Sequence, residues 1–253
     1  MASREEITEY CNRLLQAKHF NDYCPNGLQV EGKKEVNRIV SGVSACLDLL
    51  QKAQQENADM ILVHHGYFWK NDSKCITGYH KKRLQFLLKH DISLLAYHLP
   101  LDQHAEIGNN VMLAKIIEID TTGRLPSTCG IELGNIGTLQ RPVSAEYLKN
   151  ELHKKLQQNP LMITNNPNKI IKTIAWCSGA AADDIQYAIE NNVDAFITGE
   201  PAERIFHIAK ETDITFYACG HHATERYGIQ ALGKKVANQF KIDHNFIDIP
   251  CPI

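Results

Sequence analysis

Short, mostly apolar runs alternate with amphipathic stretches through the first half of the chain. The runs cover residues 39–43, 60–63 and 92–97. Between them, residues 47–57 and 84–88 repeat apolar side chains at helical spacing. Apolar strands that alternate with helices are typical of a parallel sheet covered on both faces. The pattern therefore predicts a doubly wound α/β fold.

A second series of the same kind follows a change in texture near residue 125. A helix is expected at 109–118, followed by a polar, turn-forming linker. The strand, helix and strand pattern then resumes at 171–177, 181–191 and 194–198. We therefore expect a second α/β domain over residues 126–215, so that both domains contain βαβ units and mainly parallel sheets.

The last strand and helix, over residues 214–240, fit either half of the chain. We assign them to the first domain because they carry His221 and Glu225, which we expect beside the polar strand ends of that domain. The expected division is a discontinuous first domain of residues 1–125 plus 216–253, and a second domain of residues 126–215.

Composition narrows the range of partners. Lys and Arg number 27 against 29 Asp and Glu, so a nucleic-acid partner would need a local patch and is not supported by overall charge. No apolar run approaches the ~20 residues of a membrane span, and the first residues lack a signal-peptide pattern. The eight cysteines include no Cys-x-x-Cys pair, which favours reduced thiols over a thiolate metal site. We expect a cytoplasmic protein without a membrane partner, in which His and carboxylate ligands hold any metal.

Three expected strands end in residues of types that bind metals. They are His64 and His65 after residues 60–63, His98 and Asp102 after residues 92–97, and His221 and Glu225 after residues 214–219. The carboxyl ends of strands form the binding crevice of open α/β sheets. Any one pair could be an ordinary loop histidine or a helix cap, but three such ends together favour a metal site. Pro100 is expected to keep His98 and Asp102 out of a regular helix, so that a loop carries both.

The same segments resemble the signatures of a known family. His64-His65-Gly66, His98-Leu99-Pro100-Leu101-Asp102 and Gly220-His221-His222-Ala223-Thr224-Glu225 are similar to those of the NIF-three-like dinuclear-metal-centre family, also described as GTP cyclohydrolase 1 type 2 homologues. Residues 25–32 and Thr198-Gly199-Glu200 match as well. The resemblance spans nearly the whole chain and is to the compact, YbgI-type members.

The resemblance implies a cofactor and its ligands. Each chain would hold two divalent ions of zinc, iron, manganese or nickel, with Glu225 bridging them. The implied metal ligands are His64, His65, Asp102, His221 and Glu225. Three imidazoles and two carboxylates leave two ions incompletely coordinated, with room for water between them, which favours hydrolysis.

Other residues near these motifs have two interpretations each. His98 and His222 either orient ligands or move protons, or they lie outside the site. Glu200 either faces the same crevice as an acid or base or caps a helix in solvent. His98 and Glu200 are therefore the candidate catalytic residues. The segment 178–181 either receives a phosphate on free backbone amides or, as the incomplete motif favours, forms an ordinary turn.

Two functions are compatible with these features. The first is a dinuclear-metal hydrolase acting on a small, nucleotide-like substrate, with GTP the leading candidate by resemblance. The alternative is a non-catalytic, metal-stabilised ring scaffold that binds a protein or DNA partner. The resemblance also implies a homohexamer, built as a trimer of dimers.

Overall fold

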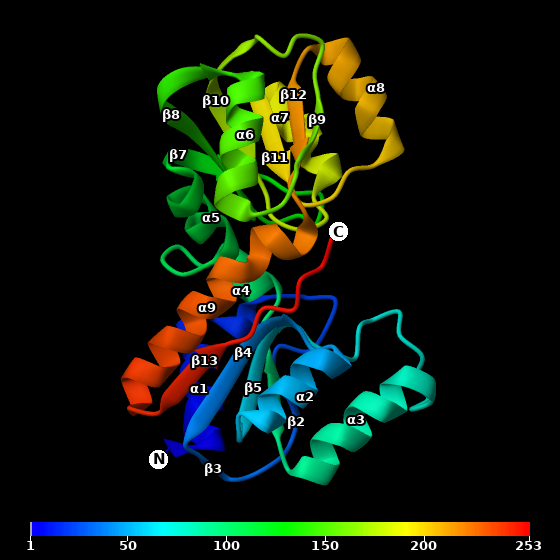
Figure 1. The fold of residues 1–253 in the computed structure, drawn as a ribbon, viewed down its shortest axis with the longest axis vertical. Helices are drawn as coiled ribbons and strands as arrows, with labels where there is room; N and C mark the ends of the chain where they lie inside the picture. Colours follow the sequence, from blue (N-terminus) through cyan, green and yellow to red (C-terminus); the bar gives the residue numbers. More distant parts are fainter. Residues whose placement is uncertain (1) are drawn as a thin grey trace. The chain divides into compact units, whose positions relative to one another are not determined.

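The computed structural model describes residues 2–253, which form two compact units (Figure 1). The first unit comprises the residues up to Gly108 together with Gly228–Ile249. The second unit comprises Asn109–Tyr227 together with Pro250–Ile253. Both units are α/β, so the fold class predicted from the alternating pattern is confirmed.

The boundaries of the units differ from the expected ones. The expected boundary fell at residue 125, but β7 (Ile119–Leu125) pairs with β8 (Gly134–Ser144) in the second unit. The last parallel strand, β12 (Thr215–Ala218), pairs with β11 (Ala195–Thr198). Residues 109–125 and 216–227 therefore belong to the second unit.

The first unit is built on a five-stranded sheet. Its strands lie in the order β13 (Asp243–Phe246), β4 (Arg38–Ser44), β5 (Met60–His65), β6 (Ser93–Ala96) and β2 (Gly27–Val30). All neighbouring pairs are parallel except β6 with β2. Because β4, β5 and β6 run in the same direction, their carboxyl ends meet at one edge of the sheet.

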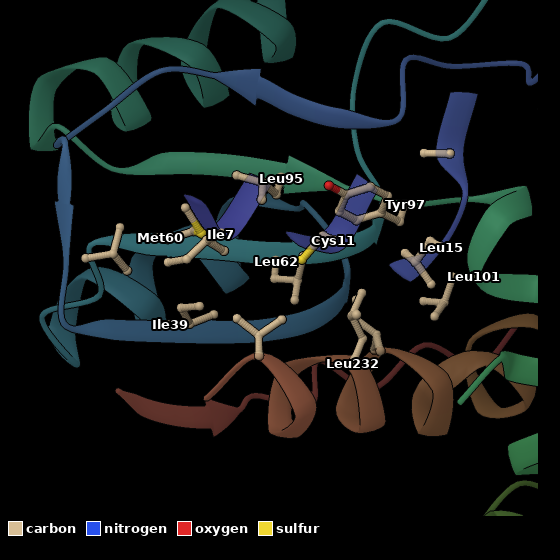
Figure 2. Close-up of a cluster of buried hydrophobic side chains, with 14 of the residues drawn as sticks. Ile7, Cys11, Leu15, Ile39, Met60, Leu62, Leu95, Tyr97, Leu101 and Leu232 are labelled. Atoms are coloured by element: carbon tan, nitrogen blue, oxygen red, sulfur yellow. The ribbon is translucent and has the colours of Figure 1, made fainter. Parts of the chain in front are cut away.

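Alternate residues of the central strands enter two separate cores. Ile39 and Leu62 lie in one core, which Figure 2 shows, whereas Val40 and Ile61 lie in the other. This alternation follows from the two-residue period of a strand, and it explains why the strands are apolar at nearly every position. The sheet of the first unit is thus covered on both faces.

Helices close both cores of the first unit (Figure 1). They are α1 (Arg4–Leu14) and the later turns of α9 (His221–Phe240) on one face, and α2 (Leu47–Gln55) and α3 (Gly78–His90) on the other. Ser3 and Glu6 form a capping box at the start of α1. The remaining short elements are β1 (Ala2–Ser3), which pairs with β3 (Glu35–Val36), and η1 (Ala17–His19).

The segment after β6 is a short helix rather than the expected loop. This helix, α4 (Leu99–Gln103), places Pro100 in its first turn. The backbone N–H groups of Leu101 and Asp102 donate to the His98 carbonyl, at 2.8 and 3.2 Å. A proline in the first turn sacrifices no helical hydrogen bond, which is why Pro100 does not prevent a helix here.

The second unit is built on a six-stranded sheet. Its strands lie in the order β7, β8, β10 (Ile170–Trp176), β11, β12 and β9 (Leu161–Ile163). The central strands β10, β11 and β12 are parallel, and the flanking strands pair antiparallel. The mainly parallel arrangement thus holds for the first sheet and for the centre of the second.

Helices pack beside this second sheet. They are α5 (Asn109–Ile117), α6 (Ala145–Leu156), η2 (Ala182–Asp184), α7 (Ile185–Glu190) and α8 (Glu203–Thr212). Trp176 is fully buried in the core formed with α5 and α6, and its indole N–H donates to the Asn110 carbonyl at 2.9 Å. Among residues 2–253, no helix combines the length and apolarity needed to cross a membrane.

Candidate metal centre

Strand β5 ends in the two adjacent histidines expected as ligands. His64 is fully buried, and its Nδ1–H donates to the Tyr97 carbonyl at 2.8 Å. A carbonyl only accepts, so Nδ1 carries a proton, and Nε2 is the nitrogen that keeps a lone pair whenever the ring is neutral. The half-buried His65 hydrogen-bonds through Nδ1 to the Ser44 hydroxyl at 3.0 Å. Both rings are thus held by one nitrogen, the arrangement typical of metal-ligating histidines.

Asp102 of α4 faces Nε2, the other ring nitrogen of His64. Oδ1 of the buried Asp102 lies 3.5 Å from His64 Nε2. A neutral imidazole nitrogen and a carboxylate both offer electron pairs, so their approach is favourable when a cation or a proton lies between them. Two ligands of a tetrahedral zinc ion, each ~2.1 Å from it, lie about 3.4 Å apart. The spacing of this pair therefore fits a shared ion.

A third imidazole joins the histidines of the first unit. The ligand nitrogens of His64, His65 and His98 all lie within 4.8 Å of one another. The His98 Nδ1–H donates to Oδ1 of Asp22 at 2.7 Å. The structure thus places His98, expected either at the site or outside it, beside His64 and His65, two of the expected ligands.

The second unit carries another imidazole–carboxylate pair at the start of α9. Gly220, with a φ of 93°, turns the chain sharply between β12 and the helix. His221 and Glu225 are one helical turn apart, and His221 Nε2 lies 3.1 Å from Glu225 Oε2. Glu225 is almost fully buried, whereas His221 is half-buried.

Glu200 lies beside the same histidine. It follows β11, and its Oε1 accepts a hydrogen bond from His221 Nδ1 at 2.6 Å. The carboxylate therefore contacts a proposed ligand and is not a cap of α8, whose N-cap is Ala202. Carboxylate partners of this kind fix the orientation of a metal-binding imidazole.

The two carboxylates control the protonation of His221. Burial alone would lower the pKa of His221, but Glu225 and Glu200 outweigh burial and raise the pKa to about 10. In the metal-free protein the ring is therefore an imidazolium that donates to Glu200 through Nδ1 and forms an ion pair with Glu225 through Nε2. A metal ion bound at Nε2 would replace that proton.

The turn at residues 178–181 uses its backbone amides within the protein. The N–H groups of Ser178, Gly179 and Ala181 donate to side-chain oxygens of Asn110, Thr224 and Thr198, at 2.8, 3.1 and 3.3 Å. Because these amides are already used within the protein, the structure favours the ordinary turn over the phosphate site.

Gly179 brings this turn against the ligand pair. Its φ is 68°, and a Cβ placed on it would overlap Glu225 Oε1 and lie 3.1 Å from His221 Nε2. Only a residue without a side chain fits this position while leaving Glu225 in place. No sequence pattern indicates this role, because Gly179 and Glu225 are far apart along the chain.

His222, the other histidine of the α9 motif, is buried in the first turn of α9. Its backbone N–H donates to the Ile253 carbonyl at 3.3 Å, which ties the C-terminal residue to the second unit. This contact gives the His222 position a structural role.

Each unit of this α/β protein therefore presents an oriented imidazole–carboxylate pair, which is the donor chemistry of a metal-binding protein. The Duf34/NIF3 (NGG1p interacting factor 3) family matches residues 2–252. The chain belongs to this family, which confirms the resemblance seen in its motifs.

Relatives in this family are similar over their full length. The chain is 48% identical over 247 residues to a Yersinia pestis protein named GTP cyclohydrolase 1 type 2 homolog, and 98% of each chain is covered. A Pseudomonas aeruginosa protein of the same name is 47% identical over 246 residues, with 97% of each chain covered.

Solved structures agree with the fold. The structure of protein ybgI, described as of unknown function, matches with a TM-score of 0.95 at 42% identity, covering 99% of this chain and 100% of that one. A Thermus thermophilus protein matches with a TM-score of 0.88 at 31% identity and the same coverage.

Proposed function

We propose that the chain binds two divalent metal ions and hydrolyses a nucleotide-like substrate with them. The proposed ligands are His64, His65, Asp102, His221 and Glu225, with Glu225 shared between the ions. The observation that carries the proposal is the pair of imidazole–carboxylate contacts, 3.5 Å in the first unit and 3.1 Å in the second. In each contact the other ring nitrogen of the histidine is held by an oxygen, which is the arrangement that prepares an imidazole for a metal.

The bound ions would polarise the substrate and lower the pKa of a nearby water. Zinc, iron, manganese and nickel all suit a set of imidazole and carboxylate ligands. The residues of the chain supply the rest of the chemistry. Glu200 orients His221. His98 lies near His64 and His65 but is not a proposed ligand. It is the group proposed to move a proton.

Substrate class is inferred from charge and from the names of relatives. The near-balance of 27 basic and 29 acidic residues gives no general attraction for long nucleic acid, so the ions would be the main attraction for an anionic substrate. The relatives named GTP cyclohydrolase 1 type 2 homolog make GTP the leading candidate.

The alternative is a metal-stabilised ring scaffold without catalysis. It is favoured by the family description, which names an interacting factor and so points to a protein partner. A DNA partner has less support because the chain has no net positive charge. A structural ion is normally fully coordinated by protein, whereas a catalytic ion keeps an exchangeable position.

The experiment is to load the purified chain with each of the four metals and to measure metal content and turnover together. GTP hydrolysis is followed by formate release and by the ultraviolet change of the opened purine, beside a panel of nucleotides, phosphodiesters and amides. We expect close to two ions per chain and turnover of at least one nucleotide.

Variants connect the activity to the ligands. Glu225→Ala should lower the occupancy of both ions because the bridge is shared, and His64→Ala should abolish turnover. His207→Ala, at an exposed position on α8, is the control and should retain both metal and activity. Full occupancy in Glu225→Ala would remove the bridging role. Absence of turnover across the whole panel with all four metals would favour the scaffold.

A further inference from the structure

A buried aspartate outside the proposed ligand set holds His98. The Asp22 side chain is only 2% exposed, and its Oδ1 accepts from His98 Nδ1 at 2.7 Å. The same oxygen accepts from the Tyr23 backbone N–H at 2.6 Å. Asp22 lies in the segment before β2, far from His98 in sequence.

The second oxygen of Asp22 also holds the turn that carries His98. Oδ2 accepts from the Leu99 backbone N–H at 2.9 Å and from the Asn26 side-chain amide at 2.8 Å. The Asn26 side-chain oxygen in turn accepts from the His98 backbone N–H at 2.8 Å. Asp22 and Asn26 therefore fix both the backbone and the ring of His98.

These donors keep the Asp22 carboxyl ionised. Burial alone would raise the pKa of Asp22, but the hydrogen bonds from His98, Asn26 and Tyr23 act in the opposite direction, and the pKa lies below its ordinary value. An ionised carboxylate only accepts hydrogen bonds, so the proton of a neutral His98 ring must be on Nδ1. Nε2 is then the acceptor nitrogen of His98.

The surroundings of His98 limit how the ring can turn. Its centroid lies 5.1 Å from that of His64 and 5.8 Å from that of His65. The Trp69 ring lies 4.9 Å away and nearly perpendicular to it, at 85°. With Nδ1 bound to Asp22, Nε2 is the ring nitrogen of His98 that can face His64 and His65. One ring nitrogen of each of these three histidines lies within 4.8 Å of the others.

We propose that Asp22 is a positioning residue, which holds His98 in the Nδ1–H tautomer with Nε2 as an acceptor directed toward the His64–His65 pair. In the hydrolysis proposed above, on which this role depends, Nε2 would accept a hydrogen bond from the reacting water or substrate. A carboxylate that orients a histidine through Nδ1 is a recurring device in hydrolases. The orientation itself belongs to the chain alone and can be measured without metal.

The first measurement uses the unaltered, metal-free chain. Histidines are labelled with ¹⁵N, and the ring signals are recorded at a pH where the His98 ring is neutral. His98→Gln identifies the His98 signals by their loss. We expect the chemical shifts of the Nδ1–H tautomer. An Nε2–H tautomer in the unaltered chain would overturn the proposal without any Asp22 variant.

The second measurement uses Asp22→Asn, which keeps the size of the side chain and removes its charge. We expect the His98 signals to change to a mixture of tautomers, while metal content stays that of the unaltered chain. Where a substrate is turned over, kcat should fall by about 10²-fold with little change in KM, the scale of an acid–base contribution. Asp48→Asn, at an exposed position on α2, is the matched control and should change none of these quantities.

The outcomes separate this proposal from the proposed function. An unchanged His98 tautomer in Asp22→Asn, or loss of metal from this variant, would make Asp22 a merely structural residue and overturn its positioning role. A shifted tautomer with intact metal content supports the role even in a protein that turns over none of the tested substrates. The absence of turnover would then count against the hydrolase and not against the orientation of His98.

Discussion

At the scale of single residues, His221 shows how neighbouring carboxylates set the protonation and orientation of a proposed ligand. The pKa of His221 is raised to about 10, so at neutral pH the metal-free ring is protonated. Glu225 and Glu200 stabilise the protonated ring in the absence of metal. In the proposed metal-bound state, the same carboxylates would keep the ring in place.

Metal binding should therefore release a proton from His221. At pH 8 the displaced proton should appear as a dependence of the calorimetric binding enthalpy on the ionisation enthalpy of the buffer. Glu200→Gln removes one of the carboxylates that raise the pKa, so this variant should release fewer protons and bind metal with a weaker pH dependence. Glu211→Gln, at an exposed position on α8, is the control.

The sign of the effect on stability follows from the same raised pKa. In the metal-free protein, the contribution of His221 to the free energy of unfolding is fully present below about pH 6.5, the ordinary pKa, and is lost as the pH rises through about 10. In the calorimetric measurement, equal proton release by Glu200→Gln and the unaltered chain would show that Glu200 does not raise the pKa of His221.

The sequence could indicate which residues gather at the proposed site, but not the contacts that hold them. His64, His98 and His221 directly follow apolar strands, and the edge of a parallel sheet collects such residues. Asp22 supports His98 from 76 positions away, and Glu200 supports His221 from 21 positions away. Such contacts depend on how loops close in three dimensions, and no periodic pattern along the chain records them.

At the scale of elements, the turn between β10 and η2 sets the space for the Glu225 carboxylate. Gly179→Ala should destabilise the chain by about 1–2 kcal/mol through its positive φ. It should also weaken metal binding, because the new Cβ would overlap Glu225 Oε1. Chemical denaturation and metal titration measure the two effects separately.

Gly130→Ala is the matched control for this substitution. Gly130 also has a positive φ, 83°, but a Cβ there meets nothing within 4 Å. The control should therefore lose stability through backbone strain and keep its metal affinity. Equal metal affinities for the two variants would show that the space beside Glu225 does not matter.

The packing of β13 on α9 in the first unit should make stability sensitive to acid. His244 on β13 hydrogen-bonds through Nε2 to the Ser41 hydroxyl at 2.8 Å. Burial, with Lys234 nearby, lowers the pKa of His244 to about 4. Between these pKa values the unfolded chain binds a proton at His244 and the folded chain does not. The stability that is present above about pH 6.5 is therefore lost as the pH falls toward 4.

A substitution isolates this contribution. His244→Asn should show a smaller fall in melting temperature between pH 6.5 and 4 than the unaltered chain, measured by thermal unfolding in the absence of metal. His19→Asn, at an exposed position in η1, should keep the full fall. If all three proteins lost stability equally, His244 would not be the group that titrates.

Element types were easier to predict than element partners. The strands around residues 39–43 and 60–63 formed as expected, because continuous apolar runs suit a sheet covered on both faces. Strand β12 was expected in the first domain, but its pairing with β11 places it in the sheet of the second unit. Its sequence is compatible with either sheet, so only the pairing decides between them. Long-range pairing is a property of the folded chain that local pattern does not contain.

At the scale of the whole molecule, the family resemblance leads us to expect a homohexamer, a trimer of dimers. Several large apolar side chains of the first unit are exposed in the single chain. Ile76, Tyr79 and Leu88 are each more than half exposed, and Ile76 and Leu88 line a hollow of about 720 Å³. Apolar surface of this kind is commonly covered in an assembly.

Six copies of the 28.6 kDa chain would have a mass of about 172 kDa. Light scattering at micromolar concentration should give this mass for the metal-loaded protein. A mass of one chain, 28.6 kDa, would contradict the expectation.

The response of the assembly to a chelator separates the two proposed functions. In the proposed hydrolase the ions serve catalysis and are not required to join copies. We therefore expect the mass to stay near 172 kDa after the metal is removed, while turnover is lost. A metal-stabilised scaffold predicts the opposite, since removal of its ions would release single chains or dimers. Light scattering before and after treatment with a chelator, with metal content measured on the same samples, decides between these outcomes, and dissociation that reverses when metal is restored would favour the scaffold.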